Sequence, residues 1–200
     1  AILATGGASY PATGSSGDGY ALAQAVGHSI VPIRPALIPL ITAGELAGRM
    51  DTLHLRNINV RMFVDGKKRM EQFGELKFTK FGVTGPTIMT LSGHAVDAIQ
   101  AGERVELSLD LKPALDEQKL DARLIRDFTT RSKEEFQSIL RGLMPRDMVS
   151  VCLEVTGIPA ERLGCQVSAK DRRRLRNWLK DFRLEVTGHR PIKEAIITAG

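Results

Sequence analysis

The periodicity of the apolar residues changes along this chain, and this change constrains the fold more than any other feature. Between residues 53 and 79 apolar and polar residues alternate, and an Asp65-Gly66 pair in the middle of that stretch is a strong hairpin signal. Residues 104–111 alternate again. From residue 115 to 182 the apolar residues recur at helical spacing. The sequence therefore predicts an α+β fold with an antiparallel, barrel-like β-sheet subdomain followed by a helical subdomain.

Shorter signals predict the remaining elements. We expect a helix over residues 18–26 closed by Gly27, a short helix after a Thr42/Glu45 capping box, strands that follow the hairpin from about residue 68 and over 75–79, a turn at 81–86, and a helix over 87–101. Four helices are expected between residues 115 and 182, one of them after a Ser132-x-x-Glu135 capping box, one after Pro145 and the last after Ser168-x-x-Asp171.

These signals divide the 200 residues into four segments. We assign 1–33 to a strand, a glycine-rich loop and a helix, 34–112 to the β-rich subdomain, 113–183 to the helical subdomain, and 184–200 to returning strands. Short apolar runs at 2–5 and 195–198 read as buried strands. We expect them to be edge strands of an incomplete α/β domain, and thus the sequence to be a piece of a longer protein. Such edges would also allow two molecules to pair as a dimer.

The positive charge is concentrated in one segment. The formal net charge is +5, and residues 162–183 contain eight Lys or Arg against two Asp. A helix over 168–183 could therefore bind nucleic acid or another polyanion. Leu175, Trp178 and Leu179 form an apolar stripe on that helix, so a solvated helix face is the simpler interpretation. Aromatic residues make up 5% of the chain, which argues against a domain that stacks single-stranded bases.

Cysteine and histidine patterns give no sign of a metal site. Cys152 lies in an apolar stretch and is expected in the core, whereas Cys165 lies in a loop and is expected to be a free thiol. The four histidines have no partner at ligand spacing, so we predict no metal. No apolar run approaches the length of a membrane span, and unpaired cysteines suit a reducing cytoplasm, where we expect the protein to reside without a membrane partner.

The stretch from Ala4 to Gly19 carries the clearest chemical signal. It contains five glycines among small hydroxyl residues and leads from a strand into a helix. Such a loop lets backbone amides approach a polar ligand, and a helix N-terminus favours anionic groups. It matches neither a P-loop nor the GxGxxG pattern. A flexible surface loop is the alternative interpretation.

Four sequence segments, in order, resemble one known family. They are residues 2–20, the proline stretch 34–40, the Gly-Glu-x-x-Phe-Thr-x-x-Gly-x-Thr-Gly-Pro run at 74–86, and residues 185–188 leading to 195–200. All four are similar to segments of the YhiN/BaiN-type, aminoacetone oxidase-like bacterial flavoproteins. The resemblance implies a discontinuous FAD-binding domain that carries a barrel-like and helical insert. The family's N-terminal GxGxxG segment and its C-terminal glycine-rich segment are not among these residues, so the resemblance implies weak FAD binding here.

The resemblance also implies roles for particular residues. Residues near the dinucleotide or facing the flavin would be Thr5, Gly6, Gly7, Pro11, Thr13, Gly14, Ser15, Gly17, Asp18 and Gly19. It names no general acid or base, because in flavoenzymes the redox chemistry belongs to the cofactor. Asp18 could equally serve the helix dipole alone, and the 82–86 run could shape a substrate approach or only a turn. The implied parent is an FAD-dependent oxidoreductase acting on a small organic molecule. Its redox partner is either NAD(P)H, as electron donor, or oxygen. The missing FAD-binding segments of the same polypeptide would be its partner.

Overall fold

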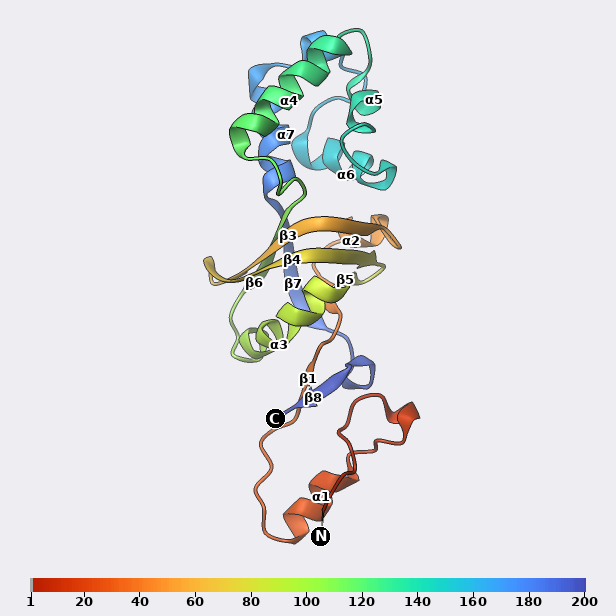
Figure 1. The fold of residues 1–200 in the computed structure, drawn as a ribbon, viewed down its shortest axis with the longest axis vertical. Coiled ribbons are helices and arrows are strands. Elements are labelled where there is room, and N and C mark those ends of the chain that lie inside the picture. Colours follow the sequence, from red (N-terminus) through yellow and green to blue (C-terminus); the bar gives the residue numbers. More distant parts are fainter. Residues whose placement is uncertain (1) are drawn as a thin grey trace.

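The computed structural model describes residues 2–200 and contains a closed antiparallel barrel (Figure 1). Six strands follow one another around it in the order β2-β5-β4-β3-β6-β7. Their bounds are β2 Leu40–Thr42, β3 His54–Val64, β4 Lys67–Thr79, β5 Gly82–Thr84, β6 Val105–Asp110 and β7 Phe182–His189. The predicted barrel-like antiparallel sheet is therefore confirmed, and closure leaves it without free strand edges.

The long hairpin forms where the sequence indicated it. Asp65 and Gly66 both have left-handed φ angles, 48° and 74°, and Val64 pairs with Lys67 across the turn, as in a two-residue type I′ connection. The structure corrects two neighbouring predictions. The stretch from residue 67 to 79 is a single strand, and residues 82–84 form strand β5 instead of a turn. A Cβ at Gly82 would lie 2.2 Å from the Leu40 carbonyl oxygen, so glycine is what lets β5 approach β2.

Helix α3 (Pro86–Gln100) packs on the barrel, and Leu91 and Ala95 of this helix are fully buried. The short helix α2 (Leu46–Arg49) begins later than predicted. Thr42 does not cap it, because Thr42 is the last residue of β2 and its amide donates to the Phe81 carbonyl, 3.1 Å away. Barrel pairing thus overrides the capping-box pattern.

The helical part contains the four helices that the periodicity predicted. They are α4 Glu117–Thr130, α5 Phe136–Leu140, α6 Arg146–Thr156 and α7 Ala169–Lys180, with a short 3₁₀ turn, η2, at Gly164–Gln166. The box at the start of α7 is present, since the Asp171 amide donates to Ser168 Oγ at 3.1 Å and the Ser168 amide to Asp171 Oδ2 at 3.1 Å. The Ser132 box is absent: the Ser132 carbonyl accepts from the Cys165 amide at 2.9 Å, and α5 begins at residue 136.

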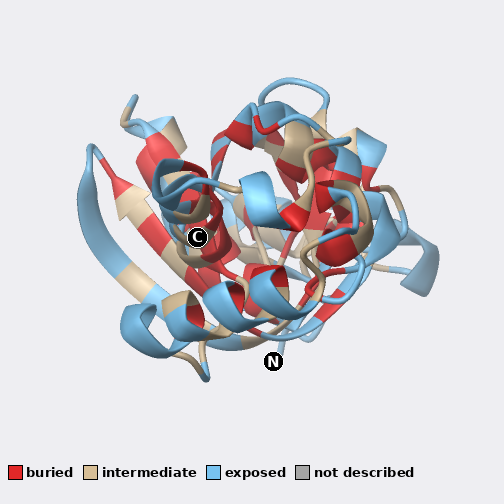
Figure 2. Cartoon of the chain, turned by 90° about the horizontal axis from the view of Figure 1, so that it is seen from above, coloured by how far each residue is buried: buried red, intermediate tan, exposed pale blue. Residues whose placement is uncertain are grey.

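One hydrophobic core runs from the barrel into the helices. Buried residues of β3, β6, α4, α6 and α7 belong to the same contiguous cluster, and Figure 2 shows the buried segments running through the centre of the molecule. Cys152 of α6 lies in this core and Cys165 is exposed, as expected. No helix in residues 2–200 is long and apolar enough to cross a membrane.

The N-terminal segment and the C-terminal strand both lie below the barrel in Figure 1. Strand β1 (Arg34–Ala36) pairs antiparallel with β8 (Ile197–Ala199), and short 3₁₀ turns lie at η1 Pro11–Thr13 and η3 Ile192–Glu194. Helix α1 (Asp18–Ala25) has no buried residue. The predicted strand at 2–5 is wrong: that segment is not in a strand, no strand within residues 2–200 pairs with it, and the Ile2 side chain is 94% exposed.

Candidate functional site

The glycine-rich loop is fastened to the C-terminal strand by one side chain. Thr198 Oγ1 on β8 accepts hydrogen bonds from the Ala8 amide at 2.9 Å and the Ser9 amide at 3.0 Å. Residues 8 and 198 thereby join segments that are 190 positions apart. Because β8 is itself paired with β1, the loop is positioned by this two-stranded sheet.

Close packing explains three of the glycines. A Cβ at Gly6 would lie 2.3 Å from Ser15 Oγ, one at Gly7 would lie 2.7 Å from Thr198 Oγ1, and one at Gly19 would lie 2.0 Å from Thr5 Oγ1. These distances are too short for real contacts, so a side chain at any of the three positions would displace the Ser15, Thr198 or Thr5 side chain that it meets. The predicted residues Thr5, Gly6, Ser15 and Gly19 thus contact one another in pairs.

A cavity of about 470 Å³ lies between the loop and β8. Of the predicted residues, Gly7, Thr13 and Ser15 line it; the structure places Thr5, Gly6, Pro11, Gly14, Gly17, Asp18 and Gly19 nearby but outside its lining. Sequence reasoning missed its other lining residues, which are Ser9, Tyr10, Ile196, Ile197 and Thr198. The lining therefore combines the five hydroxyl groups of Ser9, Tyr10, Thr13, Ser15 and Thr198 with the aliphatic side chains of Ile196 and Ile197.

The loop fits a group with hydrogen-bond acceptors. Gly14 has a φ of 96°, and a Cβ there would meet no atom within 4 Å, so its backbone faces open space. Within residues 2–200, the amides of Ser15, Ser16 and Gly17 have no protein acceptor. Gly17 also caps α1 without a side-chain hydrogen bond, which leaves the positive end of the helix accessible next to Asp18. Backbone donors of this kind suit phosphate or carbonyl oxygens, so the residues present fit one edge of a dinucleotide.

The basic helix proves to be largely neutralised by ion pairs. Four of its cations have carboxylate partners: Arg172 with Asp121 at 2.8 Å, Arg174 with Asp171, Arg176 with Glu117 at 3.4 Å, and Lys180 with Asp110 at 2.5 Å. In the described part of the chain, Lys170 and Arg173 are its cations without such a pair. Most of the charge on this helix is therefore compensated by carboxylates of the same chain. Nor do any three His, Cys, Asp or Glu side chains among residues 2–200 lie close enough to hold a metal ion.

Comparisons with known proteins agree with this architecture. Residues 34–197 match the family described as HI0933-like protein barrel and H2TH domain. The 3-dehydro-bile acid delta(4,6)-reductase of Clostridium scindens is 25% identical over 157 residues, which are 78% of this chain and 38% of that protein. The ribosomal RNA dihydrouridine synthases of Escherichia coli and Haemophilus influenzae are 26% and 25% identical over 100% of this chain, or 47% and 46% of their own lengths. The chain thus spans less than half the length of these relatives.

Proposed function

The chain belongs to the family of HI0933-like proteins with a barrel and an H2TH domain, and from this premise we propose that it forms part of an FAD-dependent reductase that saturates a conjugated carbon–carbon double bond. The family match confirms the predicted resemblance to the YhiN/BaiN-type flavoproteins and supports an oxidoreductase of that group. The observation that carries the proposal is the open loop at residues 14–17, in which the amides of Ser15, Ser16 and Gly17 have no acceptor among residues 2–200.

The reactions for which these relatives are named are of one kind. A delta(4,6)-reductase of a 3-dehydro steroid acts on double bonds conjugated to a ketone, and dihydrouridine arises when the 5,6 double bond of uracil, conjugated to a carbonyl, is saturated. In both reactions a carbon–carbon double bond conjugated with a carbonyl takes up two hydrogens, one as hydride at a carbon conjugated with the carbonyl and one as a proton. We extend this common reaction to the present chain.

The residues of this chain would bind and orient the cofactor. When bound, a reduced flavin would supply the hydride. The amides of Ser15, Ser16 and Gly17 would donate to cofactor oxygens, and Thr198 would hold the loop at the right distance by accepting from the Ala8 and Ser9 amides. No carboxylate lines the cavity against β8 in the described residues, so an electron-rich ligand meets no repulsion from its lining.

Three finer features belong to the same proposal. NAD(P)H would reduce the flavin, the reaction would take place in the cytoplasm, and the FAD-binding segments outside these 200 residues would complete the cofactor site. The rival function, a polyanion-binding module centred on α7, has less support because four cations of that helix are already paired with carboxylates.

The test is the visible spectrum and reactivity of the full natural protein. We expect a bound flavin that dithionite bleaches under anaerobic conditions and that a conjugated enone, such as a 3-oxo-Δ4 steroid or a uridine-containing RNA, reoxidises. Gly7→Ala should lower flavin occupancy because its Cβ would strike Thr198. Gly188→Ala is the matched control, since a Cβ there meets nothing within 4 Å. A colourless protein that takes up no added FAD would refute the proposal.

A further inference from the structure

A groove lies between the barrel and the helical subdomain, at the opposite end of the barrel from the glycine-rich loop (Figure 1). It consists of two adjoining cavities of about 300 and about 820 Å³. Their linings share Arg56, Leu111 and Lys112, so the two cavities meet at these residues. The smaller cavity is the more enclosed of the two, and the larger one forms the wide mouth of the groove.

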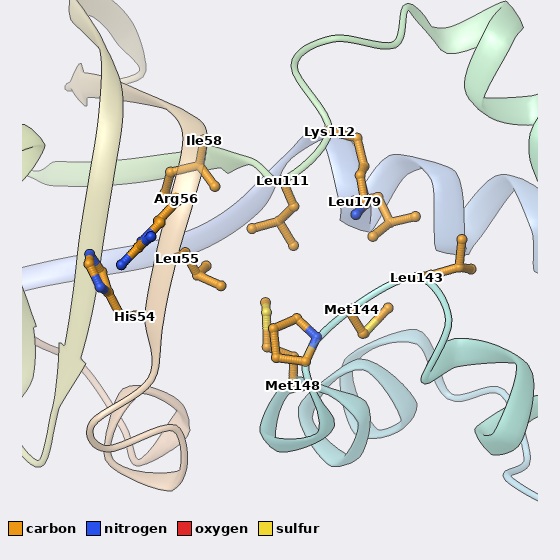
Figure 3. A pocket seen from close by; sticks show the side chains of 11 residues that line it. His54, Leu55, Arg56, Ile58, Leu111, Lys112, Leu143, Met144, Met148 and Leu179 are labelled. Carbon is orange, nitrogen blue, oxygen red and sulfur yellow. The ribbon is translucent and has the colours of Figure 1, made fainter.

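The wall of the smaller cavity is apolar, as Figure 3 shows. Strand β3, the segment before α6, α6 itself and α7 contribute the side chains of Leu55, Ile58, Leu143, Met144, Met148 and Leu179. Apart from His54, Arg56 and Lys112, no lining side chain within residues 2–200 has an N–H or O–H donor or an oxygen acceptor. A peptide group or a base placed here would lose its hydrogen bonds with water without gaining others, whereas a hydrocarbon chain would lose none. The flexible methionine side chains can also adapt to such a chain.

The charged side chains of the groove are of one sign. Arg56 and Lys112 line both cavities and Arg123 lines the larger one, whereas no Asp or Glu among residues 2–200 contributes to either lining. Carboxylates outside the lining compensate two of these cations, since Glu75 is 3.9 Å from Arg56 and Asp127 is 3.6 Å from Arg123. The point where the two cavities meet therefore favours a ligand with a negative charge at one end.

Lys112 is the cation of this groove with the least compensation. No carboxylate of the described chain lies within 4 Å of its ammonium group, and burial and then the charge of Arg123 lower the pKa of Lys112. A partly buried cation of this kind gains stability from an anionic ligand. An anionic head group would therefore bind beside Lys112.

The backbone that carries Lys112 is already ordered. The Lys180 ammonium, at the end of α7, donates to the carbonyls of Lys112 at 3.2 Å and Leu115 at 2.8 Å while it pairs with Asp110 at 2.5 Å. The Lys112 amide in turn donates to Asp110 Oδ1 at 2.9 Å. Because these contacts fix the backbone from 110 to 115, a ligand would bind Lys112 with little ordering cost.

A bulge in β3 positions the second cation of the head-group site. Leu55 pairs with Leu76 and Ile58 with Gly74, so the two residues 56 and 57 oppose the single residue 75. The bulge interrupts the alternation of the strand, and Leu55, Arg56 and Ile58 all line the smaller cavity. An arginine thus lies at the edge of an otherwise apolar wall.

An enclosed apolar cavity with cations where it opens is complementary to a molecule that has a hydrocarbon tail and one anionic head. We propose that this groove binds a medium-chain fatty carboxylate, with the unbranched tail in the smaller cavity and the carboxylate on Lys112 and Arg56. A cavity of about 300 Å³ is at the lower end of the range for small-molecule sites, which suits a single chain better than a fused ring system. The site lies away from the glycine-rich loop, so the inference goes beyond the proposed function and does not depend on the flavin.

The test is isothermal titration calorimetry of the full natural protein with hexanoate, octanoate and decanoate, each below its micelle concentration. The affinity should rise about fourfold for each added methylene group, because each group leaves water for the apolar cavity. Lys112→Gln should weaken octanoate binding about tenfold, since it removes a hydrogen bond between two charged groups. Lys170→Gln on α7 is the matched control, because it removes one charge without an ion pair outside the groove and should leave the affinity unchanged.

Two further measurements separate the head from the tail and locate the site. Octan-1-ol has the tail without the charge, so it should bind the wild type and Lys112→Gln equally well. Hydrogen exchange with and without decanoate should show slower exchange in the segments 111–115 and 143–148, which border the groove. Slower exchange confined to other segments would overturn the assignment to the groove.

Other results would also overturn the proposal. Equal affinities for acetate and decanoate would show a site for small anions, without a role for the apolar cavity. Equal weakening in Lys112→Gln and Lys170→Gln would show adsorption that follows the net charge. Tighter binding of cholate than of decanoate, with the same loss in Lys112→Gln, would assign the groove to a steroid. Absence of binding by all three acids would leave the groove without a fatty carboxylate.

Discussion

Replacement of Thr198 by Val should loosen the glycine-rich loop while leaving the barrel intact. The substitution keeps the shape of the side chain but removes the oxygen that accepts from the Ala8 and Ser9 amides. Each such hydrogen bond contributes about 1 kcal/mol, so the loss amounts to about 2 kcal/mol. This corresponds to an increase of about 30-fold in the opening equilibrium of the loop. Thr198 is not part of the hydrophobic core, so the free energy of global unfolding should change little.

Hydrogen exchange gives the direct measurement, because amide exchange reports local opening separately from global unfolding. The amides of residues 8 and 9 should exchange about 30-fold faster in Thr198→Val, whereas amides in β3 and β6 should keep their rates. Thr198→Ser retains the hydroxyl and should restore slow exchange. Unchanged exchange at residues 8 and 9 would show that these two hydrogen bonds do not hold the loop, and the proposed positioning of the flavin-facing amides would lose its basis.

Three further predictions concern the insert. Burial alone would raise the pKa of Asp171, but hydrogen bonds from Ser168 and Arg174 and the charge of Arg162 outweigh it and lower the pKa to about 2. The ionised carboxylate therefore contributes its full stabilisation above about pH 4 and loses it as the pH falls towards 2, so urea titrations should show the wild type losing about 2 kcal/mol of unfolding free energy over that range relative to Asp171→Asn. Equal losses of unfolding free energy in the wild type and in Asp171→Asn would contradict the assignment. Burial raises the pKa of Cys152 to about 12. At pH 8 an aromatic disulfide reagent should therefore modify only Cys165 in the folded chain and both thiols in denaturant. Rapid modification of both thiols in the folded chain would argue against the core position of Cys152. Leu107→Ala should lower the free energy of unfolding, measured by denaturant titration, by about 3 kcal/mol, because Leu107 is fully buried in the barrel. Phe73→Leu should lower it by less than about 1 kcal/mol. Similar losses in the two variants would mean that Phe73 is not exposed in solution.

The elements that the sequence predicted correctly are those whose signals are local. The Asp65-Gly66 turn, the Ser168 capping box and the start of α6 after Pro145 each depend on residues within a few positions of one another. The amphipathic stripe of α7 likewise identified its buried face. In such cases the backbone preference of a short segment and its tertiary environment agree, so local reasoning is sufficient.

The incorrect sequence predictions also share a physical reason, since at each of these positions a partner far away in the sequence determines the structure. Thr42 and Ser132 resemble helix caps, but contacts with Phe81 and Cys165 determine their actual roles. Residues 2–5 have the composition of a strand and no strand to pair with in the described chain. The contribution of Thr198 to the loop could not be predicted, because nothing near residue 8 indicates an acceptor 190 positions away. Backbone ladders and long-range hydrogen bonds therefore overrode local propensity at each of these positions.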